Sequence, residues 1–261
     1  MKSATLIFVL ILALAIPGVA ADDEATGSKD AFVLAGDTII PQIANGGNGF
    51  FMNFQMVNIT NTPATVTISF FAGDGTPMSV RYIQDGSTVT ATTLSDTIAP
   101  RGVEFARTDI TAPTVQIGYA RVQSNPENAI AVSTAFNQVV PGRPLFQSFV
   151  PLSTSLHNRF FVPFTNTGSS TSALAVVSVV AQTVTYRVRN NNGNELCSGS
   201  SEFPAGGHLA FVIETVQALA CSANANGVIE VSAPNIGLSG FGITAEDSGA
   251  FVTQPVYGEI P

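Results

Sequence analysis

The side chains that could do chemistry in this sequence are few and stand far apart. The most suggestive short stretch is Gly73-Asp74-Gly75, where one carboxylate lies between two glycines after an alternating run. A calcium loop needs carboxylates at about every second position, and this stretch offers one. Its counterpart, Asn191-Asn192-Gly193-Asn194, offers none. Both stretches hold Asp or Asn followed by Gly, residues that reach positive φ at low cost, so we predict two hairpin turns.

The two histidines, His157 and His208, are isolated from each other and from other metal-ligating residues. A metal site needs three or four convergent ligands, so these imidazoles are weak candidates. A Ser-His-Asp set assembles in space rather than in sequence, but no G-x-S-x-G segment nominates a serine. Glu246-Asp247-Ser248-Gly249 reads as another turn, with acid–base work by paired carboxylates as the alternative. We predict no catalytic, cofactor-binding or metal-ligating residue, no cofactor, and a protein that is not an enzyme.

The segment richest in glycine is residues 41–50, PQIANGGNGF. It does not match the phosphate-binding pattern and opens no helix, so we do not predict phosphate binding there. Asn and Gly at this density indicate a wide loop or bulge. Loops at the ends of β-sandwiches commonly carry recognition, so Asn45, Gly46, Gly47 and Asn48 form a possible binding loop.

The aromatic residues are mostly phenylalanine, with 18 Phe, four Tyr and no Trp. Sugar-binding sandwiches usually expose flat aromatic rings with one polar edge, so this composition weakens a carbohydrate-binding hypothesis without removing it. Asn58-Ile59-Thr60 matches the N-glycosylation pattern, which matters only in a host that glycosylates exported chains.

The N-terminal residues 1–21 have the three parts of a secretory signal: Lys2, an apolar run, and a small-residue cleavage site. The run of about eleven residues is too short for a membrane span, which takes roughly 20. Residues 22–37 follow as an acidic, flexible leader. We expect a secreted protein, located outside a bacterial cell, in its periplasm or at its surface, with no membrane insertion.

The two cysteines, Cys197 and Cys221, are expected to form a disulfide in that compartment. Zinc is the alternative, but two thiols without a nearby histidine pair do not make a tetrahedral site. The chain has 10 Lys and Arg against 18 Asp and Glu, and such an acidic surface repels phosphate backbones, so we expect no nucleic-acid partner. The hydrophobic fraction of 45% excludes a disordered chain.

The elements that must position these residues are predicted to be short strands. Residues 65–71 and 183–189 alternate between apolar and polar side chains, the pattern of half-buried strands. The two runs lie 118 positions apart, and Pro41 and Pro163 lie 122 apart within similar segments. Gly118 and Gly227 each precede another alternating strand. We infer an internal duplication.

The fold class that follows is all-β, with two tandem Ig-like antiparallel β-sandwiches at residues 38–153 and 154–261. The polar segment 151–158 is short enough to let the two units pack together. Phe71 and the pair Phe160-Phe161 break the alternation, and we expect them at the interface between the units or in the core. For residues 208–223 we expect a strand and then a loop, with a helical turn near Glu214–Leu219 as the alternative.

The segments IPQIANGG, MVNITNTPATVTISFFAGDG, FVPFTNT and FPAGGHLAF resemble a group of secreted tandem β-sandwich proteins of soil and environmental bacteria. The resemblance covers roughly residues 38–257. No chemistry is assigned to the group, so the resemblance implies fold and compartment only.

The function that we predict is that of a secreted, non-catalytic structural or interaction protein at the cell surface or in the extracellular matrix. Its partner would be an unknown protein or extracellular polymer. A carbohydrate-binding or adhesive module is the alternative, and an accessory or inhibitor of a secreted hydrolase is a third. The short apolar segment 31–36, AFVLAG, could add as an edge strand to a neighbouring copy and give a homo-oligomer.

Overall fold

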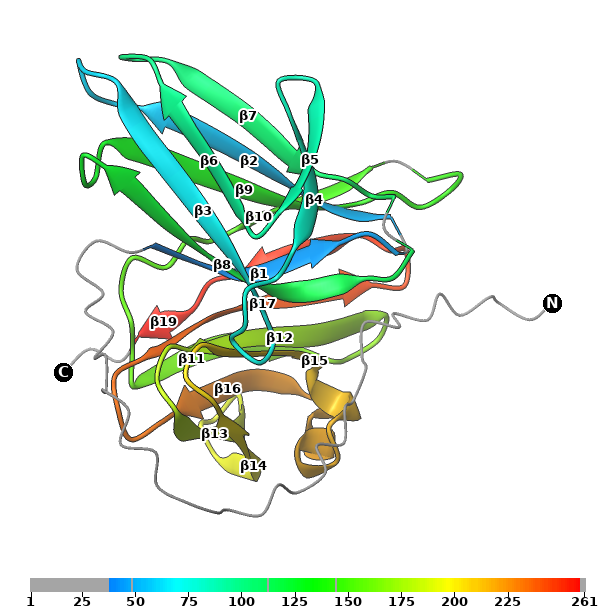
Figure 1. The fold of residues 1–261 in the computed structure, drawn as a ribbon. Coiled ribbons are helices and arrows are strands. Elements are labelled where there is room, and N and C mark those ends of the chain that lie inside the picture. Colours follow the sequence, from blue (N-terminus) through cyan, green and yellow to red (C-terminus); the bar gives the residue numbers. More distant parts are fainter. Residues whose placement is uncertain (1–37, 48, 112, 144, 259–261) are drawn as a thin grey trace, which may run out of the picture.

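The computed structural model describes residues 38–47, 49–111, 113–143 and 145–258 (Figure 1). The predicted signal segment and the leader, with its apolar AFVLAG, lie outside these residues. No helix within the described ranges has the length and hydropathy needed to cross a membrane.

The first half of the chain builds two antiparallel sheets. Sheet A has the order β1-β8-β3-β6, and sheet B has the order β10-β9-β2-β7-β4-β5. Their strands are β1 (Thr38–Asn45), β2 (Phe50–Asn58), β3 (Ala64–Ala72), β4 (Val80–Gln84), β5 (Ser87–Ala91), β6 (Thr93–Ile98), β7 (Val103–Thr108), β8 (Gln116–Asn125), β9 (Ile130–Gln138) and β10 (Phe146–Val150).

The second half builds two more. Sheet C has the order β15-β12-β17-β18, and sheet D has the order β14-β13-β16-β11-β19, again with antiparallel pairs. Their strands are β11 (Arg159–Thr165), β12 (Ser170–Ser178), β13 (Gln182–Asn190), β14 (Glu195–Phe203), β15 (Gly207–Val212), β16 (Asn226–Ser232), β17 (Leu238–Glu246), β18 (Phe251–Gln254) and β19 (Tyr257–Gly258). The predicted all-β class with antiparallel sandwiches is confirmed, and among the described strands each sheet draws on one half only.

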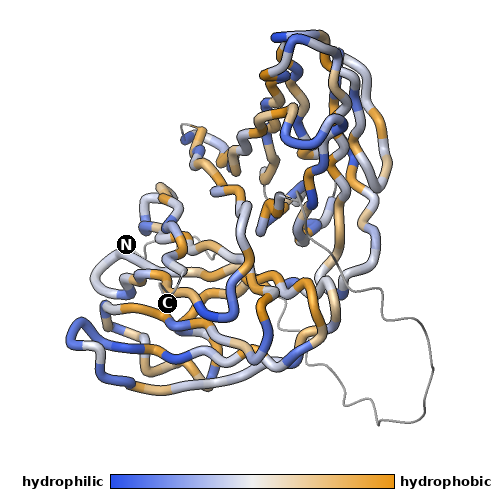
Figure 2. The backbone as a smooth tube through the Cα atoms, turned by 90° about the vertical axis from the view of Figure 1, so that its left-hand side faces the viewer, coloured by the Kyte–Doolittle hydropathy of each residue, from blue (hydrophilic) through white to orange (hydrophobic). Residues whose placement is uncertain are grey.

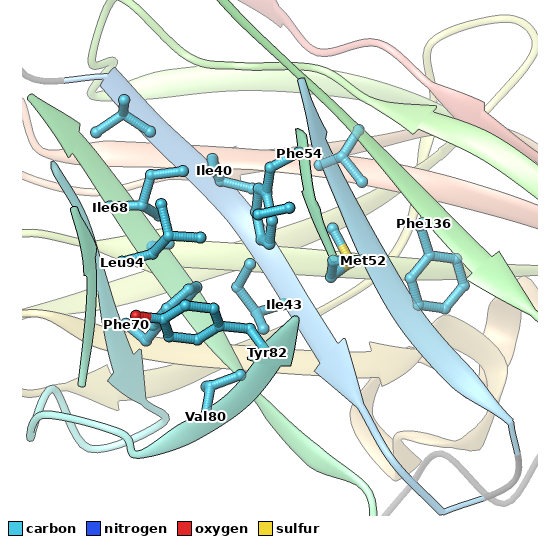
Figure 3. Close-up of a cluster of buried hydrophobic side chains, with 14 of the residues drawn as sticks. Ile40, Ile43, Met52, Phe54, Ile68, Phe70, Val80, Tyr82, Leu94 and Phe136 are labelled. Atoms are coloured by element: carbon cyan, nitrogen blue, oxygen red, sulfur yellow. The ribbon is translucent and has the colours of Figure 1, made fainter. Parts of the chain in front are cut away.

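The alternation of apolar and polar residues along each strand decides which side chains enter the core, as the sequence predicts. Val66, Ile68 and Phe70 of β3 are fully buried, whereas Thr67 and Ser69 between them are half-exposed. Figure 3 shows the inward side chains of sheets A and B meeting in the core of the first sandwich. Each large apolar side chain buried there contributes about 2 kcal/mol relative to an exposed one.

Strand order supports the internal duplication. The sheet order β1-β8-β3-β6 has the same form as β11-β16-β13-β14, and β10-β9-β2-β7 has the same form as β18-β17-β12-β15. Equivalent strands also share lengths, because β2, β3 and β9 have nine residues each, as do β12, β13 and β17. The β4–β5 hairpin is an insertion in the first half.

Two equivalent glycines show that the two halves also share the pairing register of their equivalent strands. A Cβ on Gly118 would lie 1.9 Å from the carbonyl oxygen of Phe71, and a Cβ on Gly227 would lie 1.9 Å from that of Arg189. Phe71 and Arg189 occupy the same position in β3 and β13. The backbones approach too closely there for any side chain, which explains glycine at both sites.

The strand order itself was left open by the sequence. In immunoglobulin domains the first strand pairs beside the second, in the same sheet. Here β1 pairs with β8 in sheet A, while β2 lies in sheet B, and the second half repeats this arrangement. The two halves are therefore sandwiches of the same general architecture as immunoglobulin domains, with the first strand in the opposite sheet.

The two sandwiches pack through strands that are buried on both faces. Most residues of β1, β12 and β17 are buried, and β1 contacts β12 and β17 where the two halves meet (Figure 1). Ile39 and Tyr119 of the first half form one cluster there with Val177 and Val179 of the second. Figure 2 shows hydrophobic stretches running through the region between the lobes.

The phenylalanines that break alternation separate into different environments. Phe71 packs against the inter-sandwich cluster and stacks on Tyr119 with ring centroids 5.0 Å apart, as expected for an interface residue. Phe160 is fully buried in the core of the second sandwich instead. Phe161 is half-buried on the outer face of sheet D.

The connection after β15 differs from the preferred expectation of a strand and a plain loop. The strand is present, but two short 3-10 helices follow it, η1 (Ile213–Thr215) and η2 (Gln217–Ser222). The alternative of a helical turn in this region is therefore correct. Ile213 and Leu219 are buried in the second core, which explains why the segment turns inward.

The predicted disulfide is present and joins Cys197 of β14 to Cys221 of η2, 24 positions apart. It fastens the helical connection to the edge of sheet D. Because it closes a loop of this length, its loss should destabilise the protein by about 3 kcal/mol in the chain-entropy description.

We predict that replacing both cysteines by serine lowers the free energy of unfolding by about 3 kcal/mol, measured by urea denaturation followed by circular dichroism. Wild-type protein treated with reductant should unfold at the same urea concentration as the double variant. An unchanged midpoint in both would contradict a stabilising bridge.

Candidate functional site

The Gly73-Asp74-Gly75 stretch forms a turn, and its counterpart forms the same turn. The amide of Ala72 donates to the Thr76 carbonyl, and the amide of Asn190 donates to the Asn194 carbonyl in the same way. Gly75 and Gly193 both have positive φ, of 83° and 79°. The Asp74 carboxylate accepts hydrogen bonds from the hydroxyl and amide of Thr76, which hold its pKa below the usual range.

The first turn also touches the second sandwich, a contact that the sequence did not indicate. The amide of His208 donates to the Gly73 carbonyl at 2.8 Å. A Cβ on Gly75 would lie 2.7 Å from the carbonyl oxygen of Ala205. The glycines therefore serve both the turn and the close approach of the two halves.

The possible binding loop is a compact connection from sheet A to sheet B. Gly46 and Phe50 exchange backbone hydrogen bonds of 2.9 and 3.2 Å, and Gly46, Gly47 and Gly49 all have positive φ. Asn45 is fully buried, and its Nδ2 donates to the Oε1 of Gln116 at 3.1 Å. Asn48 lies outside the described residues. A binding role of this loop stays a prediction, and Asn45 supports the loop from inside.

His208 lies at the interface of the two sandwiches. Its ring Nε2 is 2.9 Å from the Oε1 of Gln42 in β1, and its ring stacks against Tyr119 with centroids 6.4 Å apart. Burial lowers the pKa of His208 from 6.5 to about 4, although a hydrogen bond with the Pro41 backbone acts in the opposite direction. The imidazole is therefore neutral near pH 7 and holds the interface together.

His157 and the pair Glu246-Asp247 have structural roles too. The amide of His157 bonds the Leu238 carbonyl at 2.9 Å, which ties the connecting segment to β17. The Glu246 carboxylate accepts hydrogen bonds of 2.6 Å from both Ser169 and Ser170, and these bonds lower its pKa. These contacts fasten the β17–β18 turn to the start of β12.

The sequence pattern at Asn58 resembles a glycosylation site, but the structure buries the residue. Its Nδ2 donates to the carbonyls of Thr62 and Ile98 at 2.8 and 2.9 Å, and its Oδ1 accepts from the amide and hydroxyl of Thr60. Asn58 is completely shielded from solvent. A glycan cannot be attached to this amide in the folded protein.

An acidic trio escaped the sequence analysis. Asp85 in the β4–β5 turn, Asp96 of β6 and Glu104 of β7 place carboxylate oxygens within 4.8 Å of one another. Burial raises the pKa of Glu104, and the charges of Asp85 and Asp96 raise it further. Carboxylates are ligands for hard divalent cations, but close carboxylates alone do not make a metal site, and we assign none.

The outer face of sheet D carries a second charged group, which we call the arginine face: Arg159, Arg187, Arg189 and Glu230. The Glu230 carboxylate is 6% exposed and lies 2.7 Å from Nη2 of Arg189 and 3.3 Å from Nη1 of Arg187. Nε of Arg159 lies 3.4 Å from the same carboxylate. Alternation puts Arg187 and Arg189 on one face, but only the pairing of β11, β16 and β13 brings Arg159 and Glu230 to them.

Three exposed apolar side chains lie on the outer face of sheet B, two on β7 and one on β10, with β9 and β2 between these strands. We call this the contact face: Val103, Phe105 and Phe149, which are 47, 59 and 68% exposed. Directly paired residues of adjacent strands point to the same face. The pairs Gln55–Phe105, Asn53–Arg107 and Ala135–Phe149 therefore place these side chains on the same face of the sheet, with two strands between Phe149 and Phe105.

Between the sandwiches lies a small cavity of about 20 Å³. It is lined by Gln42 and by apolar residues that include Phe136, Ala175 and Phe241. That volume holds roughly one water molecule. The cavity belongs to the packing of the two halves.

Comparisons with known proteins add little to this geometry. No known protein family matches the chain, and no curated protein matches it. A solved structure described as "Biofilm associated protein - B domain" aligns over 82% of this chain and 78% of that chain, with 9% identity and a TM-score of 0.21. A similarity of this degree carries no argument about function.

His208 generates a prediction about acid stability. Its pKa is lower in the folded protein than in the unfolded chain, so its contribution is complete above pH 6.5 and is lost as the pH falls toward 4. The loss should reach about 3 kcal/mol. The measurement is the free energy of unfolding between pH 7 and 4 for wild type and for His208→Gln.

The difference between these two proteins isolates the histidine from the carboxylates that also titrate in this range. We expect the fall in stability to be smaller in His208→Gln than in wild type. Parallel curves for wild type and His208→Gln would contradict the assignment.

Proposed function

We propose that this protein is an exported, non-catalytic structural or interaction protein that works at the cell surface or in the extracellular matrix. The observation that carries the proposal is the contact face. Val103, Phe105 and Phe149 expose about half or more of their side chains on one broad sheet surface. Val103 and Phe105 are neighbours on one face of β7, and adjacent exposed apolar groups typically mark a surface that meets another molecule.

The neighbours of the contact face suit a reversible contact. Asn53, Gln55 and Arg107 lie beside the apolar side chains on the same surface. Interfaces that form and dissociate combine apolar centres with polar rims and are often rich in aromatic residues and arginine. A flat sheet surface of this kind can meet a protein or polymer without a deep pocket.

Support for a non-catalytic role comes from the environments of the ionisable groups described above. His208 is buried at an interface, Glu230 is held by arginines, and Glu246 is held by two serines. Each group is committed to stabilising the fold. A protein that acts through surface contacts does not need ionisable groups for catalysis.

Support for export comes from the disulfide. Bridges such as Cys197–Cys221 persist in oxidising compartments and are rare in the reducing cytosol. The signal-like residues at the N-terminus agree with this location.

The proposal predicts that the contact face retains the exported protein in the cell-associated or matrix fraction. In the Phe105→Ser/Phe149→Ser variant, we expect the retained fraction to fall several-fold, because the apolar contact area is removed. The measurement is quantitative immunoblotting of matrix and supernatant fractions from the same culture.

Ile236→Ser is the matched control, because Ile236 is 68% exposed but lies in the turn before β17. Circular dichroism should show that all variants are folded. Equal retention of wild type and the double variant would contradict the proposal.

A carbohydrate-binding or adhesive module is a second candidate, favoured by the arginine face. Tyr257 is 56% exposed and pairs with Phe161, which pairs with Glu230 in the next strand, opposite Arg187. An exposed aromatic ring on a face that also carries guanidinium groups suits a sugar that bears a carboxylate.

This candidate predicts that polygalacturonate slows the protein in affinity electrophoresis, whereas neutral dextran does not. Tyr257→Ala should weaken the retardation roughly tenfold, the effect of losing one stacking contact, while Tyr257→Phe should retain it. Identical mobility with and without polygalacturonate would remove the candidate.

A further inference from the structure

The contact between the two sandwiches joins unlike faces. Around Ile39 and Tyr119 the first sandwich contributes the outer side of sheet A, and the second contributes the outer side of sheet C, with Val177 and Val179. Further along the same face of sheet C, Ala175, Phe241 and Ile243 pack against the core of the first sandwich. By strand order, sheet A corresponds to sheet D, and sheet B corresponds to sheet C. The internal contact is therefore head to tail, and within the described residues no sandwich packs on the outer faces of sheets B and D.

The free face of sheet B keeps apolar residues at the positions that make the internal contact. Val57 pairs with Val103 and Gln55 with Phe105, as Val177 pairs with His208 and Ala175 with Ala210. These registers make Val103 and Phe105 the counterparts of His208 and Ala210. His208 is buried at the interface, whereas Val103 and Phe105 are exposed.

The residue after β2 is likewise exposed where its counterpart in the second sandwich is buried. Ile59 follows Asn58, the last residue of β2, and Val179 follows Ser178, the last residue of β12. Val179 is 3% exposed inside the inter-sandwich cluster, whereas Ile59 is 51% exposed. Exposure of these side chains in the first sandwich is explained if the first sandwich has its own neighbour.

The free face of sheet D keeps the matching positions. Ile39 pairs with Arg121 as Phe161 pairs with Glu230, and Phe71 pairs with Tyr119 as Arg189 pairs with Val228. Phe161 and Val228 are thus the counterparts of Ile39 and Tyr119. Both are apolar and only half-buried.

We propose that the outer face of sheet D of one copy binds the outer face of sheet B of a second copy, in the arrangement that already joins the two sandwiches within the chain. This rests on the proposed function and names the partner of the contact face as the same protein. Phe161 and Val228 of one copy meet Val57, Ile59, Val103 and Phe105 of the next.

The charged residues set the strength of this contact. Arg189 stands at the position of Phe71, so the intermolecular contact buries fewer apolar groups than the internal one. The outer polar groups of terminal units in stacked proteins limit further stacking in the same way. Association is therefore reversible and concentration-dependent.

A head-to-tail contact does not close on itself after two copies unless the rotation between copies forms a ring. The expected assembly is a short open chain that lengthens with concentration. Its average mass should pass through that of a dimer and continue to rise.

The first experiment is sedimentation equilibrium of the purified protein between about 10 μM and 1 mM, a range that covers weak association. We expect the weight-average mass of wild type to rise past that of a dimer. Ile59→Ser/Phe105→Ser and, separately, Phe161→Ser should each weaken association at least tenfold, whereas Ile236→Ser should behave as wild type. Val228→Lys provides a second sheet D variant if Phe161→Ser is poorly folded.

The second experiment mixes the two defective proteins in equal amounts. Each retains the face that the other has lost, so the mixture should form dimers and nothing larger. A contact between like faces would instead leave one variant dimeric on its own and the mixture without new dimers, and that result would overturn the proposal.

Wild type that stays monomeric throughout the range would also overturn it. Loss of assembly on deletion of residues 22–37, with both faces intact, would assign self-association to the leader and overturn the face contact. If wild type is monomeric while Phe105→Ser/Phe149→Ser still escapes the matrix fraction, the proposed function stands and this inference fails.

Discussion

The structure depends on one apolar layer between two unlike sheet faces. Ile39 and Tyr119 on one side and Val177 and Val179 on the other exclude water from the junction. Because of this layer, β1 is buried on both sides although it lies at the edge of sheet A. Without it, two separate sandwiches would each expose a hydrophobic surface, which soluble proteins avoid.

The two copies diverged mainly on the surfaces that face away from each core. The turn after β3 and the close approach at Gly118 recur after β13 and at Gly227, since both are conditions of the backbone. Side chains on the outer faces are not constrained by the backbone in this way, so Phe71 in one copy corresponds to Arg189 in the other. The inner faces preserve the fold, and the outer faces decide what each sandwich contacts.

Sequence reasoning succeeded where the cause is local. The alternation of residues 183–189, the Asp-Gly and Asn-Gly turns, and the Cys197–Cys221 bridge all follow from neighbouring residues or from compartment chemistry. It failed where distant strands combine. Asp85, Asp96 and Glu104 come from three strands or turns, and nothing in their spacing shows that they meet. The helical turn near Glu214–Leu219 was only the alternative expectation, because burial of Ile213 and Leu219 decides it.

The sequence by itself determined the strands, their turns, the duplication and the disulfide, because period-two alternation and glycine conformations act over a few residues. Tertiary structure alone decided that His208 is a buried interface residue and not a surface one, and that Asn58 is enclosed by hydrogen bonds. It also decided which faces pack and which stay exposed. The physical reason is that the burial of a side chain depends on which other segment packs over its strand. The residues of the strand itself do not specify that segment.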